Sequence, residues 1–76
     1  MFMDIAELRA LVETLLYDIE FVYNGKPGSI CPLAEDFFAL ACGDMFINVT
    51  TVDEVFSAPF LDGKTIPDVL DQITFY

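Results

Sequence analysis

The sequence contains no histidine and only three cationic residues, Arg9, Lys26 and Lys64, against thirteen acidic ones. A net charge of -10 on 76 residues argues against a surface that grips phosphate, because neutralising a nucleic-acid backbone takes clustered lysine and arginine. The missing imidazole removes the commonest general base and the commonest metal ligand. We therefore expect no direct nucleic-acid binding, no metal and no cofactor.

The chain also lacks a long apolar run. No run approaches the roughly 20 residues that cross a bilayer, and the first residues lack the basic region of a secretion signal. The anionic surface would be repelled by acidic lipid headgroups. These features predict a soluble, cytoplasmic protein with no membrane partner.

Cysteine is scarce, with Cys31 and Cys42 as the only two. A disulfide is compatible with the sequence, but cytosolic thiols usually stay reduced, so we expect two free, partly buried thiols. No imidazole can act as their base, and surrounding anions would raise a thiol pKa. A small enzyme or redox protein that uses Cys31 or Cys42 is thus a minor alternative, and a non-enzymatic role is favoured.

Apolar residues are abundant instead. They make up 55% of the chain and include eight phenylalanines and three tyrosines, which is high for one domain spanning residues 1–76. A domain of this size buries roughly 60% of the surface that its unfolded chain exposes. Either the core is dense, or some apolar surface faces a partner, which leaves a homodimer open.

The first predicted element is a helix. Asp4 and Glu7 are spaced for a variant of the capping box, and Met3 and Leu8 for the hydrophobic staple that accompanies it. Apolar residues then recur at three- and four-residue spacing, which forms one stripe on a helix; they are Ile5, Leu8, Leu11, Val12, Leu15, Leu16 and Ile19.

A first antiparallel hairpin is predicted from residues 18–23, where Ile19, Phe21 and Tyr23 fall at alternate positions, and from a short return strand at residues 29–33. Residues 24–28, Asn-Gly-Lys-Pro-Gly, form the expected turn. Because Pro32 cannot donate to a ladder, we place the second strand at a sheet edge, or ending there.

A second hairpin is predicted from residues 37–42 and 45–50, joined by Gly43-Asp44 in a two-residue turn of the Gly-first kind. Both faces of this hairpin are apolar, since Phe37 and Phe38 begin the two alternating sets. The hairpin is therefore either covered on more than one side or exposes a patch.

Two short helices are predicted to close the chain. Thr51 and Thr65 are placed as caps, with acidic residues in the turns that follow. Ala58-Pro59 stops the first helix, and Val69, Leu70 and Ile73 give the second its apolar side. The fold class is α+β: an N-terminal helix, a four-stranded antiparallel meander of two hairpins, and two short C-terminal helices.

Seven of the thirteen acids have local roles in helix caps and turns; they are Asp4, Glu7, Asp44, Asp53, Glu54, Asp62 and Asp68. The remaining six would have to line one face to imitate phosphates; they are Glu13, Asp18, Glu20, Glu35, Asp36 and Asp71. An acidic decoy that inhibits a nucleic-acid-binding protein is the second functional alternative.

The function favoured by the sequence is a protein-interaction or self-associating module. A loop that carries Phe60 and Leu61 is either tucked onto the core or offered to a partner, and the second hairpin raises the same question. The candidate interface residues are Phe37, Phe38, Phe46, Phe60 and Leu61.

Two segments carry a resemblance: residues 23–32, Tyr-Asn-Gly-Lys-Pro-Gly-Ser-Ile-Cys-Pro, and residues 59–64, Pro-Phe-Leu-Asp-Gly-Lys. Most of the chain from Tyr17 onward resembles a group of small proteins of unknown function from Gram-positive bacteria. The resemblance implies a bacterial, cytoplasmic protein with one compact α+β domain, and it implies no catalytic residue.

Overall fold

The computed structural model describes residues 3–15 and 18–76; Leu16, which the predicted helical stripe includes, and Tyr17 lie outside the described residues. The elements follow in the order α1 (Ile5–Thr14), β1 (Ile19–Tyr23), β2 (Lys26–Ala34), β3 (Phe37–Cys42), β4 (Met45–Val49), α2 (Val52–Ser57), α3 (Ile66–Val69), the 3-10 turn η1 (Leu70–Gln72) and β5 (Ile73–Phe75). The α+β class is confirmed.

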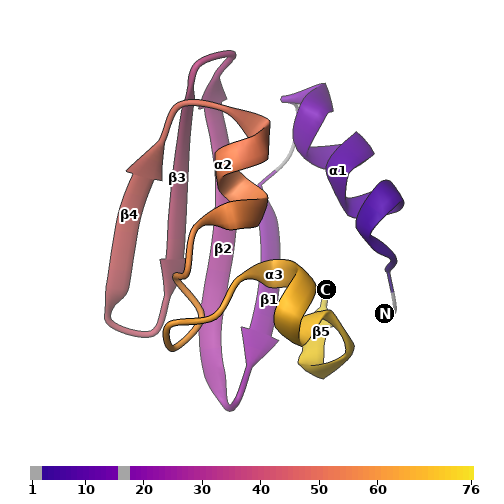
Figure 1. The fold of residues 1–76 in the computed structure, drawn as a ribbon, viewed down its shortest axis with the longest axis vertical. Helices are drawn as coiled ribbons and strands as arrows, with labels where there is room; N and C mark the ends of the chain where they lie inside the picture. Colours follow the sequence, from indigo (N-terminus) through magenta and orange to yellow (C-terminus); the bar gives the residue numbers. More distant parts are fainter. Residues whose placement is uncertain (1–2, 16–17) are drawn as a thin grey trace.

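The strands form one antiparallel sheet in the order β4-β3-β2-β1-β5, and the helices lie on one side of it (Figure 1). The four-strand prediction is wrong by one, because β5 pairs with β1 through Phe21–Phe75 and Tyr23–Ile73. Ile73 was predicted to lie on a helix. Its three- and four-residue spacing from Leu70 and Val69 fits a helix, but η1 ends at Gln72 and the chain extends from Ile73 onward.

Local capping fixes where the helices begin. Asp4 Oδ1 accepts a hydrogen bond from the Glu7 backbone N–H at 2.8 Å, and Glu7 returns one, so the predicted capping box is confirmed. Thr51 and Thr65 cap α2 and α3 as predicted. Leu15 ends α1 with a left-handed backbone at φ 59°, so the chain turns there towards β1.

The first hairpin is tighter than predicted. Asn24 and Gly25 alone form the turn, with φ of 54° and 77°, and β2 begins at Lys26. Pro27 and Gly28 were placed in the turn and instead lie in the strand. The carbonyl oxygen of Pro27 accepts a hydrogen bond from the Gly43 N–H at 2.9 Å. Because the N–H and C=O of a strand residue point to the same side, the missing N–H of Pro27 also lies at the end of β3, where a proline is tolerated.

The prediction that Pro32 places its strand at a sheet edge, or ends it, is wrong for the strand as a whole, since β2 continues to Ala34. β2 lies between β1 and β3, inside the sheet. Pro32 pairs with Phe38 of β3, but the pairing with β1 ends at Ile30, and a register shift follows between Pro32 and Ala34. The proline thus occupies the part of β2 that has one neighbouring strand among the described residues.

The second hairpin matches its prediction except that β4 ends at Val49, one residue earlier than predicted. β3 and β4 pair in unbroken register from Phe38–Val49 to Cys42–Met45. Gly43 takes the positive φ, 59°, required at the first position of a Gly-first two-residue turn.

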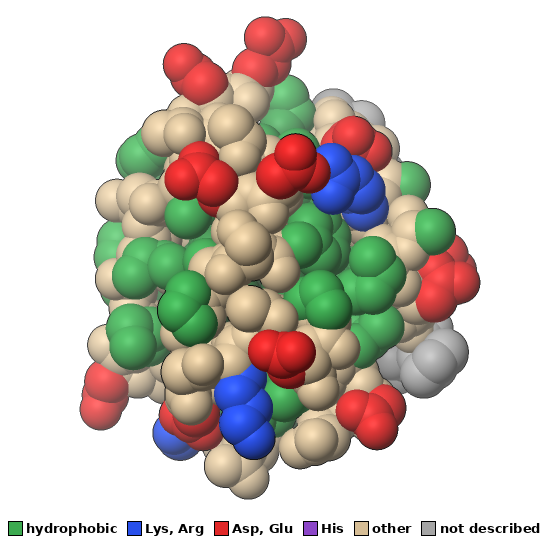
Figure 2. Space-filling view, viewed as in Figure 1, with side chains coloured by type: hydrophobic (Ala, Val, Ile, Leu, Met, Phe, Trp, Pro, Cys, Tyr) green, Lys and Arg blue, Asp and Glu red, His purple; other side chains and the backbone are tan. Residues whose placement is uncertain are grey.

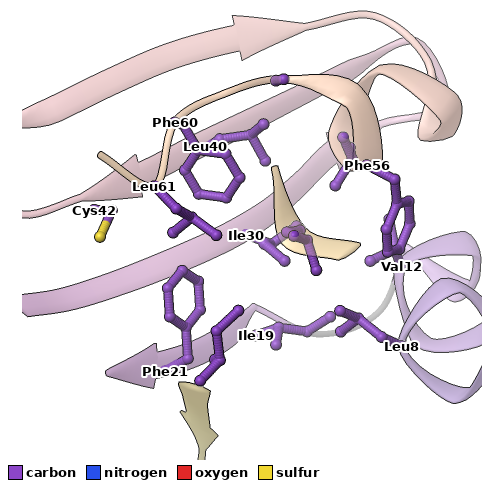
Figure 3. Packing of buried hydrophobic residues seen from close by; sticks show 14 of the residues in the cluster. Leu8, Val12, Ile19, Phe21, Ile30, Leu40, Cys42, Phe56, Phe60 and Leu61 are labelled. Carbon is purple, nitrogen blue, oxygen red and sulfur yellow. The ribbon is translucent and has the colours of Figure 1, made fainter. Parts of the chain in front are cut away.

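The core lies between the sheet and the helices (Figure 3). Leu8 and Val12 of α1 point into it and are fully buried. From the other side, Phe60 of the loop between α2 and α3 packs edge-on against Phe21 of β1, with ring centroids 6.3 Å apart. All three helices and the inward side of the sheet therefore share one apolar cluster.

Candidate interaction surface

The face of the sheet that points away from the helices is the candidate surface, and we call it the open face. Strand residues alternate between the two faces, so the buried row Ile19, Ile30 and Leu40 defines the helix-covered side. The open face carries the residues between them; from the strand pairing these are Glu20, Val22, Pro27, Ser29, Cys31, Phe37, Ala39, Ala41, Phe46, Asn48 and Thr74.

The open face is almost free of charge. One row across it joins Glu20, Ser29, Ala41 and Phe46, and Glu20 is the one carboxylate that the strand pairing places on this face. This face therefore carries far less charge than the average for a chain with thirteen acidic residues. Removing charged groups from water is the main cost of burying a polar surface. Burying the open face would therefore cost little, because it carries little charge.

Large apolar side chains are exposed around this face. Phe37 is 40% exposed, and Phe46 on the edge strand is 63% exposed. Leu33, at the β2 irregularity, and Tyr76, after β5, are also exposed. Tyr76 borders a shallow depression of about 330 Å³ over the middle of the face, together with Glu20, Ser29 and Ala41.

The structure divides the five residues predicted for an interface. Phe37 and Phe46 are exposed on the open face, whereas Phe38, Phe60 and Leu61 are buried in the core. The loop holding Phe60 and Leu61 is tucked inward, one of the two outcomes that the sequence left open. Leu33 and Tyr76 were not predicted; Leu33 could have been found from its strand position one residue after Pro32.

The helix-covered side carries more charge than the open face. Acidic side chains are spread across it with apolar side chains between them (Figure 2).

The six acids without local roles are all exposed and belong to separate segments. They are Glu13 on α1, Asp18 before β1, Glu20 on β1, Glu35 and Asp36 in the β2–β3 turn, and Asp71 on η1.

The sequence contains two turns of the form Asx-Gly-Lys, residues 24–26 and 62–64, and the structure brings them together. Lys26 Nζ donates to Asp62 Oδ1 at 2.6 Å. This hydrogen bond lowers the pKa of Asp62, and Asp62 in turn raises the pKa of Lys26. Asp62 and Gly63 both have positive φ, 56° and 81°, so this turn repeats the backbone form of Asn24-Gly25.

The Lys26–Asp62 pair borders a second hollow, of about 500 Å³, beside Cys42 and the β3–β4 turn. Burial raises the pKa of the Cys42 thiol, which favours the unreactive thiol form. Cys31 lies on the open face, where its Sγ contacts Ser29 Oγ at 3.7 Å. Both cysteines are free, as expected, and their positions on opposite faces of the sheet keep them apart.

Within residues 3–15 and 18–76, no group of three or more acidic, cysteine or histidine side chains could hold a metal ion. No helix in the same ranges combines the length and apolar character needed to cross a membrane. Comparisons with protein-family models, curated proteins and solved structures give no match for this chain.

Proposed function

We propose that the protein is a non-enzymatic interaction module whose open face binds a protein, either another chain or a further copy of itself. One observation carries this proposal: a sheet face with one carboxylate and with exposed Phe37 and Phe46, on a chain of net charge -10. Exposed apolar surface of this kind marks interaction sites in soluble proteins.

Two further features support the open face over the helix side. Aromatic side chains without neighbouring charge are enriched at the centres of protein interfaces. The face also has room for a partner, because the domain measures 29 × 23 Å across the two longer axes that define its broad side. This footprint is comparable with the roughly 800 Å² per partner of a standard interface.

The acidic decoy and the cysteine-dependent enzyme stay predictions. Neither gains a specific supporting contact, since the six acids of the decoy lie on separate segments and the Cys42 thiol has a raised pKa. The interaction module is favoured because it accounts for the exposed Phe37 and Phe46 on the open face, which the packing of the fold does not explain.

The test is capture of partners from the source cell by the wild type and by Phe37→Ser. We expect Phe37→Ser to lose the partner, with the affinity of the purified pair falling at least about tenfold, as for an interface anchor. Ala10→Ser is the matched control, since Ala10 is exposed on α1, away from the open face. Equal binding by all three proteins would refute the open face as the binding surface.

A further inference from the structure

β4 is an edge strand without the usual protection. Its outer side has no neighbouring strand among the described residues. Natural edge strands are commonly blunted by lysine, proline or a bulge, yet residues 45–49 read Met-Phe-Ile-Asn-Val and pair with β3 in unbroken register. The opposite edge, β5, is only three residues long, which is itself a protective device.

The outward backbone groups of β4 belong to Phe46 and Asn48. Cys42 and Met45 flank a two-residue turn and form a hydrogen-bonded pair, and such pairs alternate along an antiparallel ladder. Phe46 and Asn48 therefore direct their N–H and C=O groups away from β3. The ladder cannot extend past this end, because the Thr50 N–H already donates to Glu54 Oε1 at 3.1 Å.

We propose that two copies of this chain pair antiparallel along β4, with the two-fold axis at Phe46, and so form one continuous sheet. The pairing goes beyond the proposed function, because it uses the edge of the sheet and takes a second copy of the chain as the partner there. The two Phe46 residues then exchange backbone hydrogen bonds, and their rings lie side by side on the open face. Cross-strand aromatic pairs of this kind stabilise sheets.

A second copy fits this edge because the strand is complementary to itself in that register. On the helix-covered side, Met45, which is 44% exposed, lies opposite Ile47 of the second copy, so exposed apolar side chains of both faces gain partners. At the ends, Asp44 lies opposite Asn48 of the second copy, an amide that can donate to a carboxylate.

Neighbouring registers are less favourable. With the axis at Ile47, Asp44 would lie opposite Thr50 of the second copy, where the Glu54 carboxylate is held. Like charges opposite one another destabilise a sheet. With the axis at Asn48, Phe46 would face Thr50, whose N–H is already engaged. Of these three registers, only the one at Phe46 avoids both conflicts.

The test combines sedimentation equilibrium with amide hydrogen exchange of the full chain at increasing concentration. When nine-tenths of the chains are dimeric, exchange at Phe46 and Asn48 should slow about tenfold, because only the monomer exchanges. Met45 and Ile47, which already donate to β3, should change less. Association should strengthen from about 50 to about 300 mM NaCl, because salt screens the repulsion between two anionic copies.

Phe46→Lys and Phe37→Lys form the matched pair of variants, since both side chains are exposed on the open face and only Phe46 is on the edge. We expect Phe46→Lys to weaken dimerisation at least tenfold and Phe37→Lys to retain it. If Phe37→Lys alone lost dimerisation, the contact between the two copies would lie on the open face. The edge pairing would then be wrong, and the proposed function would stand. A monomer at about 1 mM, with unchanged exchange at Phe46, would overturn the pairing; partner capture then decides the function separately.

Discussion

At the scale of single residues, the missing side chain of Gly28 shapes the sheet. Gly28 lies opposite Phe21 in β1, and a Cβ at this position would come within 2.4 Å of the Phe21 ring and 2.8 Å of the Ala41 carbonyl oxygen. The ring of Phe21 therefore occupies the space over the glycine, and from there it reaches Phe60 and Phe75. One glycine thus allows the central aromatic group to pack.

Gly28→Ala should destabilise the fold by about 1–3 kcal/mol, the usual effect of overpacking a core. Urea unfolding at neutral pH measures the change. In Phe21→Leu/Gly28→Ala, the smaller side chain relieves part of the clash, so the loss should be smaller than the sum of the two single losses. An unchanged urea midpoint for Gly28→Ala would contradict the packing described here.

The Lys26–Asp62 ion pair makes stability depend on pH. The folded state lowers the pKa of Asp62, chiefly through the hydrogen bond from Lys26, and raises the pKa of Lys26. The Asp62 contribution is present above the unfolded pKa, about 3.9, and is lost as pH falls through the lower folded value. The Lys26 contribution is present below about 10.4 and is lost as pH rises through the folded value.

We therefore expect Asp62→Asn to be less stable than the wild type at pH 7, with the difference narrowing as pH falls below about 4. Urea unfolding at several pH values measures it. Lys26→Met removes the other partner and should reproduce the same narrowing. A difference that stays constant down to pH 2 would assign the effect of Asp62→Asn to something other than the ion pair.

At the scale of elements, the parts with local causes were predictable. Helix starts depend on side chains three residues apart, so Asp4–Glu7 could be recognised without knowing the fold. The same holds for Gly43 in its turn. β5 was not predictable because it is three residues long and depends on pairing with β1, far away in the chain. The edge position predicted from Pro32 was wrong because it depends on where β1 ends relative to Pro32, which is a property of the tertiary structure.

α2 offers a test of such a local cause. Thr51 Oγ1 accepts from the Glu54 N–H at 3.1 Å and starts a helix that places Val55 and Phe56 in the core. Thr51→Ala should lower the free energy of unfolding by about 1 kcal/mol, while Thr51→Ser keeps a capping oxygen and should stay near the wild type. Equal losses in the two variants would show that the threonine methyl group, not the cap, matters.

At the scale of the whole molecule, the candidate surface was predictable in kind and not in position. The sequence indicates that the β3–β4 hairpin is apolar on both faces, but it does not indicate which face the helices cover. Phe37 and Phe38 are neighbours of the same type, and only the packing of the helices buries one and exposes the other. The burial of Phe60 and Leu61 likewise depends on where their loop folds back.

The charge imbalance also acts on the whole molecule. Of the three cations, Arg9 pairs with Asp53 and Lys26 with Asp62, so most of the thirteen carboxylates repel one another across a domain 29 Å long. The Debye length is about 30 Å at 0.01 M salt, similar to the length of the domain, and added salt shortens it to about 8 Å at 0.15 M. Self-repulsion destabilises a compact state. Screening should therefore favour folding.

We expect the urea midpoint to rise as NaCl increases from about 10 to about 200 mM, because relief of repulsion among many acids outweighs the weakening of the ion pairs. The measurement is urea unfolding at pH 7 and at low protein concentration, which keeps self-association from contributing. Glu35→Gln/Asp36→Asn removes two exposed negative charges from the β2–β3 turn and should show a smaller rise. A midpoint that falls with salt would mean that the ion pairs of Arg9 and Lys26 dominate the electrostatics of the fold.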